Sequence, residues 1–246
     1  MRAMILAAGF GSRLRPMTDH TPKALIDIEG RPILEIVIRR LIFAGASAII
    51  INTHHLANQI EEFLKNRDFG VPIDISFEKE ILETGGGLKK AEFFFKDDQP
   101  FFLHNADVLS NIDLKEFYQF HLDHPALATL SVRSRPSSRA LLFNPKGQLC
   151  GTQNGANTKW ASEIIQTAQP MAFDGIHVIS PQIFSKITEV GKFSIIEPYL
   201  RLAQNGEKIH AFYSDRFSWA DIGSFENLEQ VKKQPALWLS ESKNNG

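Results

Sequence analysis

The chain has 246 residues, of which 43% are hydrophobic, and a formal net charge of −1 at pH 7. This length and composition fit one compact α/β domain, or one domain with a small appendage. The near-zero charge gives no reason to expect a nucleic-acid or membrane partner, and no apolar run approaches the ~20 residues needed to span a bilayer. With Cys150 as the single cysteine, no internal disulfide can form, so we expect a reducing, cytoplasmic setting.

Strand and helix patterns alternate through the first half of the chain. Strands are expected as short apolar or alternating runs, and helices where apolar residues recur every three or four positions. The pattern predicts strands at 3–8, 48–52, 73–77 and 100–104, and helices at 32–44, 56–65, 87–94 and 114–124. This alternation predicts an α/β fold of Rossmann type, with a mostly parallel central sheet and helices on both faces in three layers. Ligands of such sheets bind at the carboxyl ends of the strands.

The second half is less regular. Strands are predicted at 127–133, 140–143, 171–179 and 209–213, and helices at 198–205 and 224–233. The polar, Gly- and Asn-rich segment 151–158 predicts a loop, and Ser224 is expected to cap the last helix. A single domain is therefore expected over residues 1–235, with halves at about 1–125 and 126–235, followed by a polar tail at 236–246 that frays from Ser240 onward.

The first predicted strand ends in Gly9-Phe10-Gly11-Ser12-Arg13, and Lys23 follows shortly after. Gly9 and Gly11 let backbone N–H groups approach an anion closely, while Arg13 and Lys23 add full positive charge. The segment lacks the Gly-Lys-Ser/Thr of a P-loop, and Leu14 stands where a dinucleotide fingerprint has its third glycine. The pattern predicts a polyphosphate site of another kind. The alternative is a Gly-rich turn with solvated cations.

Two carboxylates and one further Gly-rich segment also indicate a site. Asp107 follows an apolar strand, and Asp221 lies in Trp219-Ala-Asp-Ile-Gly223. Both stand at strand ends, where two carboxylates can hold Mg²⁺ together with substrate phosphates, although each alone is more often a cap or turn residue. Leu82-Glu-Thr-Gly-Gly-Gly87 precedes a predicted helix and indicates a loop that approaches an anion or a base, with a simple flexible loop as the alternative.

The string Leu6-Ala7-Ala8-Gly9-x-Gly11-Ser12-Arg13-Leu14-x-Pro16-x-Thr18, followed by Pro22-Lys23, resembles the sugar-1-phosphate nucleotidyltransferases. The resemblance extends from Met4 to about Val231. It implies that Arg13 contacts the leaving pyrophosphate and that Lys23 contacts the phosphate at which bonds change. The loop residues implied to bind the nucleotide are Leu6, Ala7, Ala8, Gly9, Gly11, Ser12, Arg13 and Lys23.

The same resemblance assigns the remaining site residues. Asp107 and Asp221 match the metal-binding positions, which makes Arg13, Lys23 and Asp107 the implied catalytic residues. Ala106 departs from the family, which usually has glycine there. The implied base contacts are Glu83, Thr84 and Gly85, and the implied sugar contacts are Asn105, Gly175 and Glu197. A Glu-Lys-Pro sugar clamp is not recognisable between Arg139 and Glu163, which leaves the sugar open.

The resemblance implies Mg²⁺-dependent transfer of a nucleoside monophosphate from an NTP to a sugar 1-phosphate, with release of pyrophosphate. The form Leu-Glu-Thr-Gly-Gly-Gly is most similar to a branch with N-acetylmuramate-1-phosphate uridylyltransferases and some mannose-1-phosphate guanylyltransferase-like proteins, which favours UTP and a cell-wall sugar. Among these sugars N-acetylmuramate 1-phosphate is favoured. A GTP- or dTTP-dependent mannose- or glucose-1-phosphate nucleotidyltransferase, or a phosphocholine-type cytidylyltransferase that uses CTP, remains an alternative. A non-catalytic nucleotide or sugar sensor is a second, and a dinucleotide-dependent oxidoreductase is disfavoured by the missing third glycine. The oligomeric state stays open, with a homodimer among the options.

Overall fold

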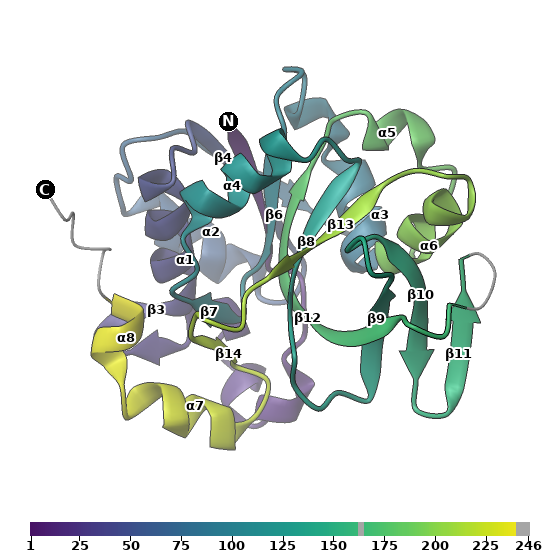
Figure 1. The fold of residues 1–246 in the computed structure, drawn as a ribbon. Helices are drawn as coiled ribbons and strands as arrows, with labels where there is room; N and C mark the ends of the chain where they lie inside the picture. Colours follow the sequence, from purple (N-terminus) through teal and green to yellow (C-terminus); the bar gives the residue numbers. More distant parts are fainter. Residues whose placement is uncertain (162–164, 240–246) are drawn as a thin grey trace, which may run out of the picture. The chain divides into compact units, whose positions relative to one another are not determined.

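The computed structural model describes residues 1–161 and 165–239, which form two compact units (Figure 1). Unit 1 comprises Met1–Ile81, His104–Lys115 and the chain from Phe217 onward, and unit 2 comprises Leu82–Leu103 and Glu116–Arg216. The C-terminal segment therefore belongs to the same unit as the N-terminal strands, although a simple division near residue 125 would separate them. Within the described residues, no helix is both long and apolar enough to cross a bilayer.

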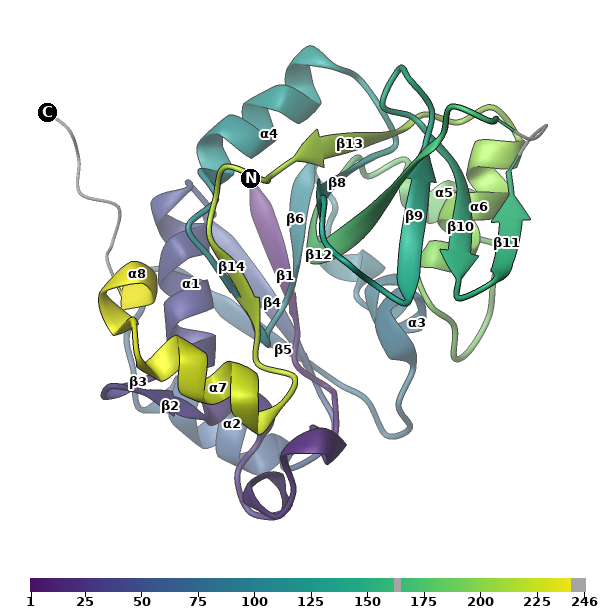
Figure 2. The ribbon, with the colours of Figure 1, turned by 60° about the horizontal axis from the view of Figure 1, so that its bottom comes forward.

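Unit 1 is built on three parallel strands, in which β1 (Arg2–Leu6) pairs with β4 (Ala48–Thr53) and β4 pairs with β5 (Ile73–Phe77) (Figure 2). Ile49, Ile50 and Ile51 are all inaccessible to solvent, so both faces of β4 are covered. This is typical of parallel sheets, whose crossover helices protect both sides. The crossovers here are α1 (Ile33–Phe43) and α2 (Ala57–Lys65), and α2 packs against β5.

The other elements of unit 1 are short. Antiparallel pairs join β2 (Asp27–Ile28) to β3 (Arg31–Pro32) and β7 (Val108–Ser110) to β14 (Trp219–Asp221), and 3-10 helices cover Ser12–Leu14, Met17–Asp19 and Lys23–Leu25. The predicted cap of α7 (Phe225–Lys232) is confirmed, because Ser224 Oγ accepts a hydrogen bond from Asn227 N (3.2 Å). Residues 235–239 form α8 (Pro235–Leu239), whose Trp238 is buried. Residues 240–246 of the expected tail lie outside the described residues.

Unit 2 mixes parallel and antiparallel strands. Strand β8 (Ala128–Arg133) pairs in parallel with β13 (Ile209–Tyr213) and antiparallel with β12 (Gln169–Ile179). Antiparallel pairs then continue from β12 to β9 (Arg139–Phe143), β10 (Leu149–Asn154) and β11 (Asn157–Trp160). The helices of unit 2 are α3 (Glu83–Lys90), α5 (Ile183–Lys186), α6 (Ile196–Gln204) and the 3-10 helix Glu92–Phe94. The boundaries between the units fall within β6 (Phe101–Asn105) and α4 (Leu114–Asp123). Stacked rings of Phe95, Phe101 and Phe184 lie in the core of unit 2.

The predicted α/β class is confirmed, but two local predictions are wrong. Segment 151–158 is not a loop, because most of it belongs to strands β10 and β11, which turn at Gly155 with φ of 56°. Strand β11 lies at the edge of its sheet, and Asn157, Thr158 and Lys159 are exposed there. An exposed edge strand is polar by necessity, so it carries little of the apolar alternation from which strands are predicted.

Helix α3 begins at Glu83, four residues before the expected start at Gly87, so the three glycines lie inside a helix and not in a loop. Close packing explains them. A Cβ on Gly85 would lie 2.3 Å from the Phe193 ring, and a Cβ on Gly86 would lie 2.2 Å from the carbonyl oxygen of Gly191. The N–H groups of Gly85 and Gly86 also donate to the carbonyl oxygen of Phe193 (3.0 and 3.3 Å). The glycines therefore let the first turns of α3 contact the backbone at 191–195.

We predict that Gly86→Ala lowers the free energy of unfolding by about 1–3 kcal/mol, because the added methyl group meets a backbone oxygen that cannot move aside without cost. Urea unfolding followed by circular dichroism measures this. Lys90→Ala, on the exposed side of the same helix, is the control and should change stability by about 0.5 kcal/mol or less. Equal stability of the Gly86→Ala protein and the wild type would contradict the packing explanation.

Candidate active site

The glycine loop after β1 is held at its start by a buried polar chain in unit 1. Ala7 N–H donates to Asn52 Oδ1 (2.7 Å), and Asn52 Nδ2 donates to Glu78 Oε1 (2.7 Å). Farther along, a Cβ on Gly9 would have no described atom within 4 Å, so the space beside this residue is open. The loop is thus anchored at one end and accessible at the glycine expected to approach a phosphate.

Gly11 places the loop against Lys23. Its φ of 64° is in the left-handed region, and a Cβ there would lie 2.8 Å from Thr18 Cγ2 and 3.2 Å from Lys23 Cβ. Thr18 Oγ1 donates to the carbonyl oxygen of Gly11 (2.9 Å), and His55 Nε2 donates to the carbonyl oxygen of Thr18 (2.9 Å). A side chain at position 11 would therefore push the loop off its supports.

Lys23 and Asp107 form an ion pair in the structure. Lys23 is largely buried, with 13% of its side chain exposed, whereas 32% of the Asp107 side chain is accessible. The turn that carries Asp107 lies beside the end of β1, because Ala106 N–H donates to the carbonyl oxygen of Leu6 (3.0 Å). The predicted catalytic lysine and the first predicted metal ligand are thus brought together beside the glycine loop.

Asp221 joins this group through the β7–β14 pair. It lies opposite Val108, and Ile222 N–H donates to the carbonyl oxygen of Asp107 (2.8 Å). Its Oδ1 accepts hydrogen bonds from Gly223 N (2.8 Å) and Asn227 Nδ2 (3.0 Å). The position of Asp221 is therefore fixed by its strand and by the first turn of α7.

The guanidinium of Arg13 lies beside Gly223, as the carboxylate of Asp221 does. A Cβ on Gly223 would lie 2.7 Å from Arg13 Nη2 and 2.5 Å from Asp221 Oδ1, so the side-chain ends of Arg13 and Asp221 both lie against Gly223, in space that a larger residue would take. Unit 1 therefore contains Arg13, Lys23, Asp107 and Asp221 on neighbouring segments. Thr18 and Gly223 belong to the motifs of the sequence, but their supporting roles come from the structure. Asn52, His55 and Asn227, which also hold this group in place, carry no motif signal in the sequence.

The two carboxylates have the chemistry of a magnesium site, which needs few protein ligands. In residues 1–161 and 165–239, no group of three or more His, Cys, Asp or Glu side chains is arranged to hold a metal ion. Oδ1 of Asp107 and Oδ2 of Asp221 have no hydrogen-bond partner among these residues, so each carboxylate keeps a free oxygen. Mg²⁺ is commonly bound by one or two carboxylates, with phosphates and water completing its octahedron.

Asn105 and Ala106 lie at the end of β6, beside Asp107. Asn105 is half-buried, and Ala106 is buried with its N–H bonded to β1. Burial lowers the pKa of the neighbouring His104 to about 4, so its imidazole is neutral at pH 7. His104 Nδ1 donates a hydrogen bond to the carbonyl oxygen of Asn105 (2.8 Å), so this nitrogen is already bonded within the protein.

The residues implied to contact the base lie in unit 2, in the first turn of α3. Thr84 Oγ1 accepts a hydrogen bond from Ile195 N (2.9 Å), and Gly85 is covered by Phe193. Glu83 has a left-handed φ of 59° and an ion pair with Lys192 (3.5 Å). These contacts give Thr84 and Gly85 packing roles within unit 2, and their contact with a base stays a prediction.

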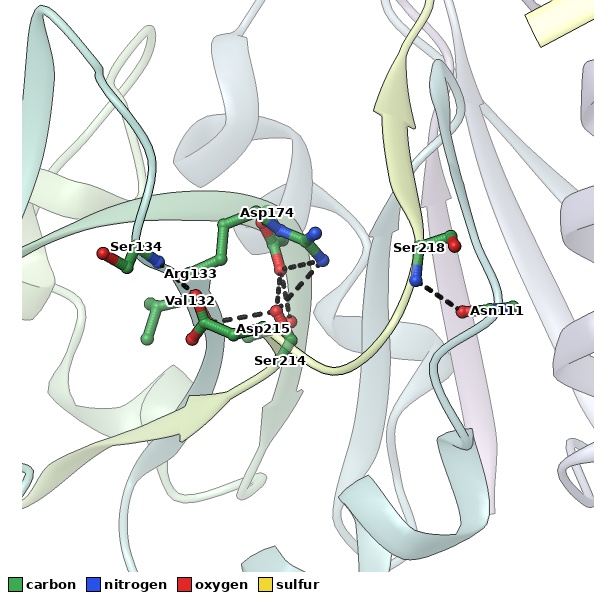
Figure 3. Close-up of polar contacts among 9 residues, drawn as sticks. Asn111, Val132, Arg133, Ser134, Asp174, Ser214, Asp215 and Ser218 are labelled. Atoms are coloured by element: carbon green, nitrogen blue, oxygen red, sulfur yellow. Dashed lines mark hydrogen bonds and ion pairs between the residues drawn. The ribbon is translucent and has the colours of Figure 1, made fainter.

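Gly175, an implied sugar contact, lies at an irregularity of β12 between Phe173 and His177, with φ of 80°. The preceding Asp174 is fully buried and bonded to Arg133 Nε (2.7 Å), Ser131 Oγ (2.8 Å) and Ser214 Oγ (Figure 3). A buried carboxylate with several donors holds one conformation strongly. The ion pair of Asp174 with Arg133 thus fixes the direction of the backbone at Gly175.

Glu197, the other implied sugar contact in unit 2, is exposed in the first turn of α6. It lines a pocket of about 890 Å³ within unit 2, together with Phe173 of β12. The other lining residues come from β9 to β11 with their adjoining turns, and from α6 with the segment before it: Ser137, Arg139, Ala140, Leu141, Thr152, Gln153, Asn154, Ala156, Asn157, Thr158, Lys159, Ser194, Ile196 and Leu200. Glu163, the last residue of the segment in which no Glu-Lys-Pro sugar clamp is recognisable, lies outside the described residues.

We predict that Asp174→Ala lowers the free energy of unfolding by about 3–5 kcal/mol, because it leaves the Arg133 guanidinium buried without its carboxylate. Asp215→Ala is the matched control. Asp215 accepts a single bond from Ser134 N (2.8 Å) at the surface, so its loss should cost about 1 kcal/mol (Figure 3). Thermal and urea unfolding measure both variants, and equal losses would contradict the special role of the buried pair.

The chain matches the family model described as Nucleotidyl transferase over residues 2–143. It is 31% identical to N-acetylmuramate alpha-1-phosphate uridylyltransferase of Neisseria meningitidis serogroup B, over 97% of this chain and 100% of that protein. It is 28% identical to Mannose-1-phosphate guanyltransferase of Gibberella zeae over 91% of this chain, and it spans only 61% of the length of that relative.

Among solved structures, the fold is similar to that of UDP-glucose pyrophosphorylase complexed with UDP-glucose. The TM-score is 0.78 at 17% sequence identity, with 96% of this chain and 98% of that chain covered. At this identity, the likeness concerns the fold alone.

Proposed function

The chain belongs to the nucleotidyl transferase family, and on that premise we propose that it transfers UMP from UTP to N-acetylmuramate 1-phosphate. The products are the UDP-sugar and pyrophosphate. The observation that carries this proposal is the placement of Arg13, Lys23, Asp107 and Asp221 around one glycine loop in unit 1. The full-length likeness to the Neisseria protein favours this base and this sugar.

In the proposed reaction, an oxygen of the sugar phosphate attacks the α-phosphorus of UTP, and the bond from that phosphorus to the bridging oxygen breaks. Pyrophosphate leaves with the electron pair. The attacking phosphate needs no general base, because its second pKa is about 6 and it is mostly dianionic at neutral pH. The task of the protein is therefore alignment and neutralisation of charge.

The four charged residues of the candidate site each contribute to aligning the substrates and neutralising their charge. The N–H groups of the glycine loop face the triphosphate, Lys23 stabilises the negative charge on the α-phosphoryl group, and Arg13 stabilises the departing pyrophosphate. Asp107 keeps the largely buried Lys23 paired until substrate phosphates replace it as a partner. When bound by Asp107 and Asp221, Mg²⁺ would supply further positive charge to the substrate phosphates.

Unit 2 is proposed to supply the contacts that select the substrates. Glu83, Thr84 and Gly85 are assigned to the base, and Gly175 and Glu197 to the sugar, with Asn105 of unit 1. The Gibberella relative makes GTP and mannose 1-phosphate the second candidate pair. A sensor that binds nucleotide without turnover would not need two cations and two carboxylates at the phosphate site.

The test is pyrophosphate release with Mg²⁺ over a grid of UTP, GTP, CTP and dTTP against N-acetylmuramate-, N-acetylglucosamine-, glucose- and mannose 1-phosphate. The proposal expects the highest rate with UTP and N-acetylmuramate 1-phosphate. A strong signal with GTP and mannose 1-phosphate instead would support the second candidate. A blank grid with an NTP still bound would contradict the proposed activity in favour of the sensor.

We predict that Lys23→Ala slows the single-turnover rate by about 100- to 1,000-fold, the effect typical of removing one preorganised electrostatic contact at a reacting centre. Rapid-quench measurement at saturating substrates isolates this step. Arg15→Gln is the control, because Arg15 is an exposed cation paired with Asp19 (3.1 Å), and its rate should match the wild type. An unchanged rate in Lys23→Ala would remove Lys23 from the chemical step.

A further inference from the structure

The pocket in unit 2 has a wall formed by one face of β9, β10 and β11. Arg139 lies directly opposite Asn154, and Thr152 lies directly opposite Lys159. Side chains alternate along a strand, so Thr152 and Asn154 share a face, and their cross-strand partners lie on the same face. Arg139 on β9 and Lys159 on β11 therefore lie on one face on either side of β10, Arg139 next to Asn154 and Lys159 next to Thr152, and all four line the pocket.

The rest of the pocket combines an apolar floor with further polar side chains. Leu141, opposite Thr152 and buried, lies on the same face, and Phe173 adds an aromatic ring. Glu197 of helix α6 and Ser194, just before that helix, also line the pocket. The volume of about 890 Å³ is within the roughly 300–1,000 Å³ typical of small-molecule sites, which combine apolar lining with a few placed polar groups.

The charges of this pocket are unbalanced. Among the described lining residues, the charged side chains are Arg139, Lys159 and Glu197. Within the described chain, neither cation has an ion-pair partner within 4 Å, and neither makes a side-chain hydrogen bond. Two such cations beside an apolar floor attract an anion. The phosphates of the proposed reaction already have Arg13 and Lys23, so these two cations are available for a second anionic group on the substrate.

We propose that Arg139 and Lys159 bind a carboxylate carried by the sugar ring, so that the pocket selects acidic sugar 1-phosphates over neutral ones. This inference rests on the proposed function and assigns its sugar specificity to named residues. Arg139 can bind a carboxylate through two parallel N–H bonds, and Lys159 adds a point charge from the other side of strand β10. Glu197 is an acceptor for ring hydroxyl groups or an amide N–H.

The test compares two substrates that differ only by a carboxylate-bearing lactyl ether, which are N-acetylmuramate 1-phosphate and N-acetylglucosamine 1-phosphate. In Arg139→Gln and in Lys159→Gln, kcat/KM should fall about tenfold or more for the acidic sugar, the scale of one charge-assisted hydrogen bond. It should change less than about twofold for the neutral sugar, which offers no charged group to lose. The double variant should lose the preference altogether. Lys146→Gln, an exposed cation on the turn between β9 and β10, is the control and should leave both values unchanged.

Two results would overturn the inference. An unchanged ratio of the two kcat/KM values in the double variant would show that Arg139 and Lys159 do not bind the carboxylate. An equal loss for both sugars would show that they act on the shared phosphate or on the fold. Binding of both sugar phosphates is measured in parallel by calorimetry with a non-transferable UTP analogue. Absent turnover of either sugar would contradict the proposed function alone, and equal binding of the two sugars would still contradict the inference.

Discussion

The ion pair between Lys23 and Asp107 joins two segments that lie 84 positions apart in the chain. The largely buried Lys23 requires a negative partner, because an uncompensated charge at such a position is costly. Asp107 is placed by the end of β1 through Ala106 and in turn places β14 through Ile222. The positions of the loop, the lysine and both carboxylates therefore depend on one another, and under the proposed function substrate phosphates compete for the same lysine.

Small residues make this arrangement sterically possible. Gly11 allows the loop to lie against Lys23, and Gly223 leaves space for the side-chain ends of Arg13 and Asp221. In unit 2, Gly85 and Gly86 have the same kind of purpose, since they let α3 approach the backbone at 191–195. The glycines of this chain thus serve close contact between segments as much as binding, which is why a Gly-rich run alone does not distinguish a ligand loop from a packed helix.

The sequence allowed prediction of the regular parts of the fold and of the charged residues of unit 1. Strand β4 was predictable because its buried isoleucines are contiguous, whereas Lys23 and Asp107 were singled out through the long motif string and the family resemblance, since a single cation or carboxylate at a strand end is more often a turn residue. The edge strand β11 was not predictable, since its side chains face solvent. The helix α3 was predicted, but its start at Glu83 was not, because the glycines of its first turns pack against Phe193 and Gly191, far away in the sequence. Supporting residues such as Asn227 were missed because their role exists only in three dimensions.

Divalent-metal binding in the presence of nucleotide shows whether unit 1 holds a metal and a triphosphate around the Lys23–Asp107 pair. Electron paramagnetic resonance with Mn²⁺ and UTP reports the bound metal. We predict that Asp107→Asn and Asp221→Asn each weaken Mn²⁺ binding about tenfold or more, since each removes a charged ligand. Wild-type affinity for Mn²⁺ in the double variant would contradict this prediction.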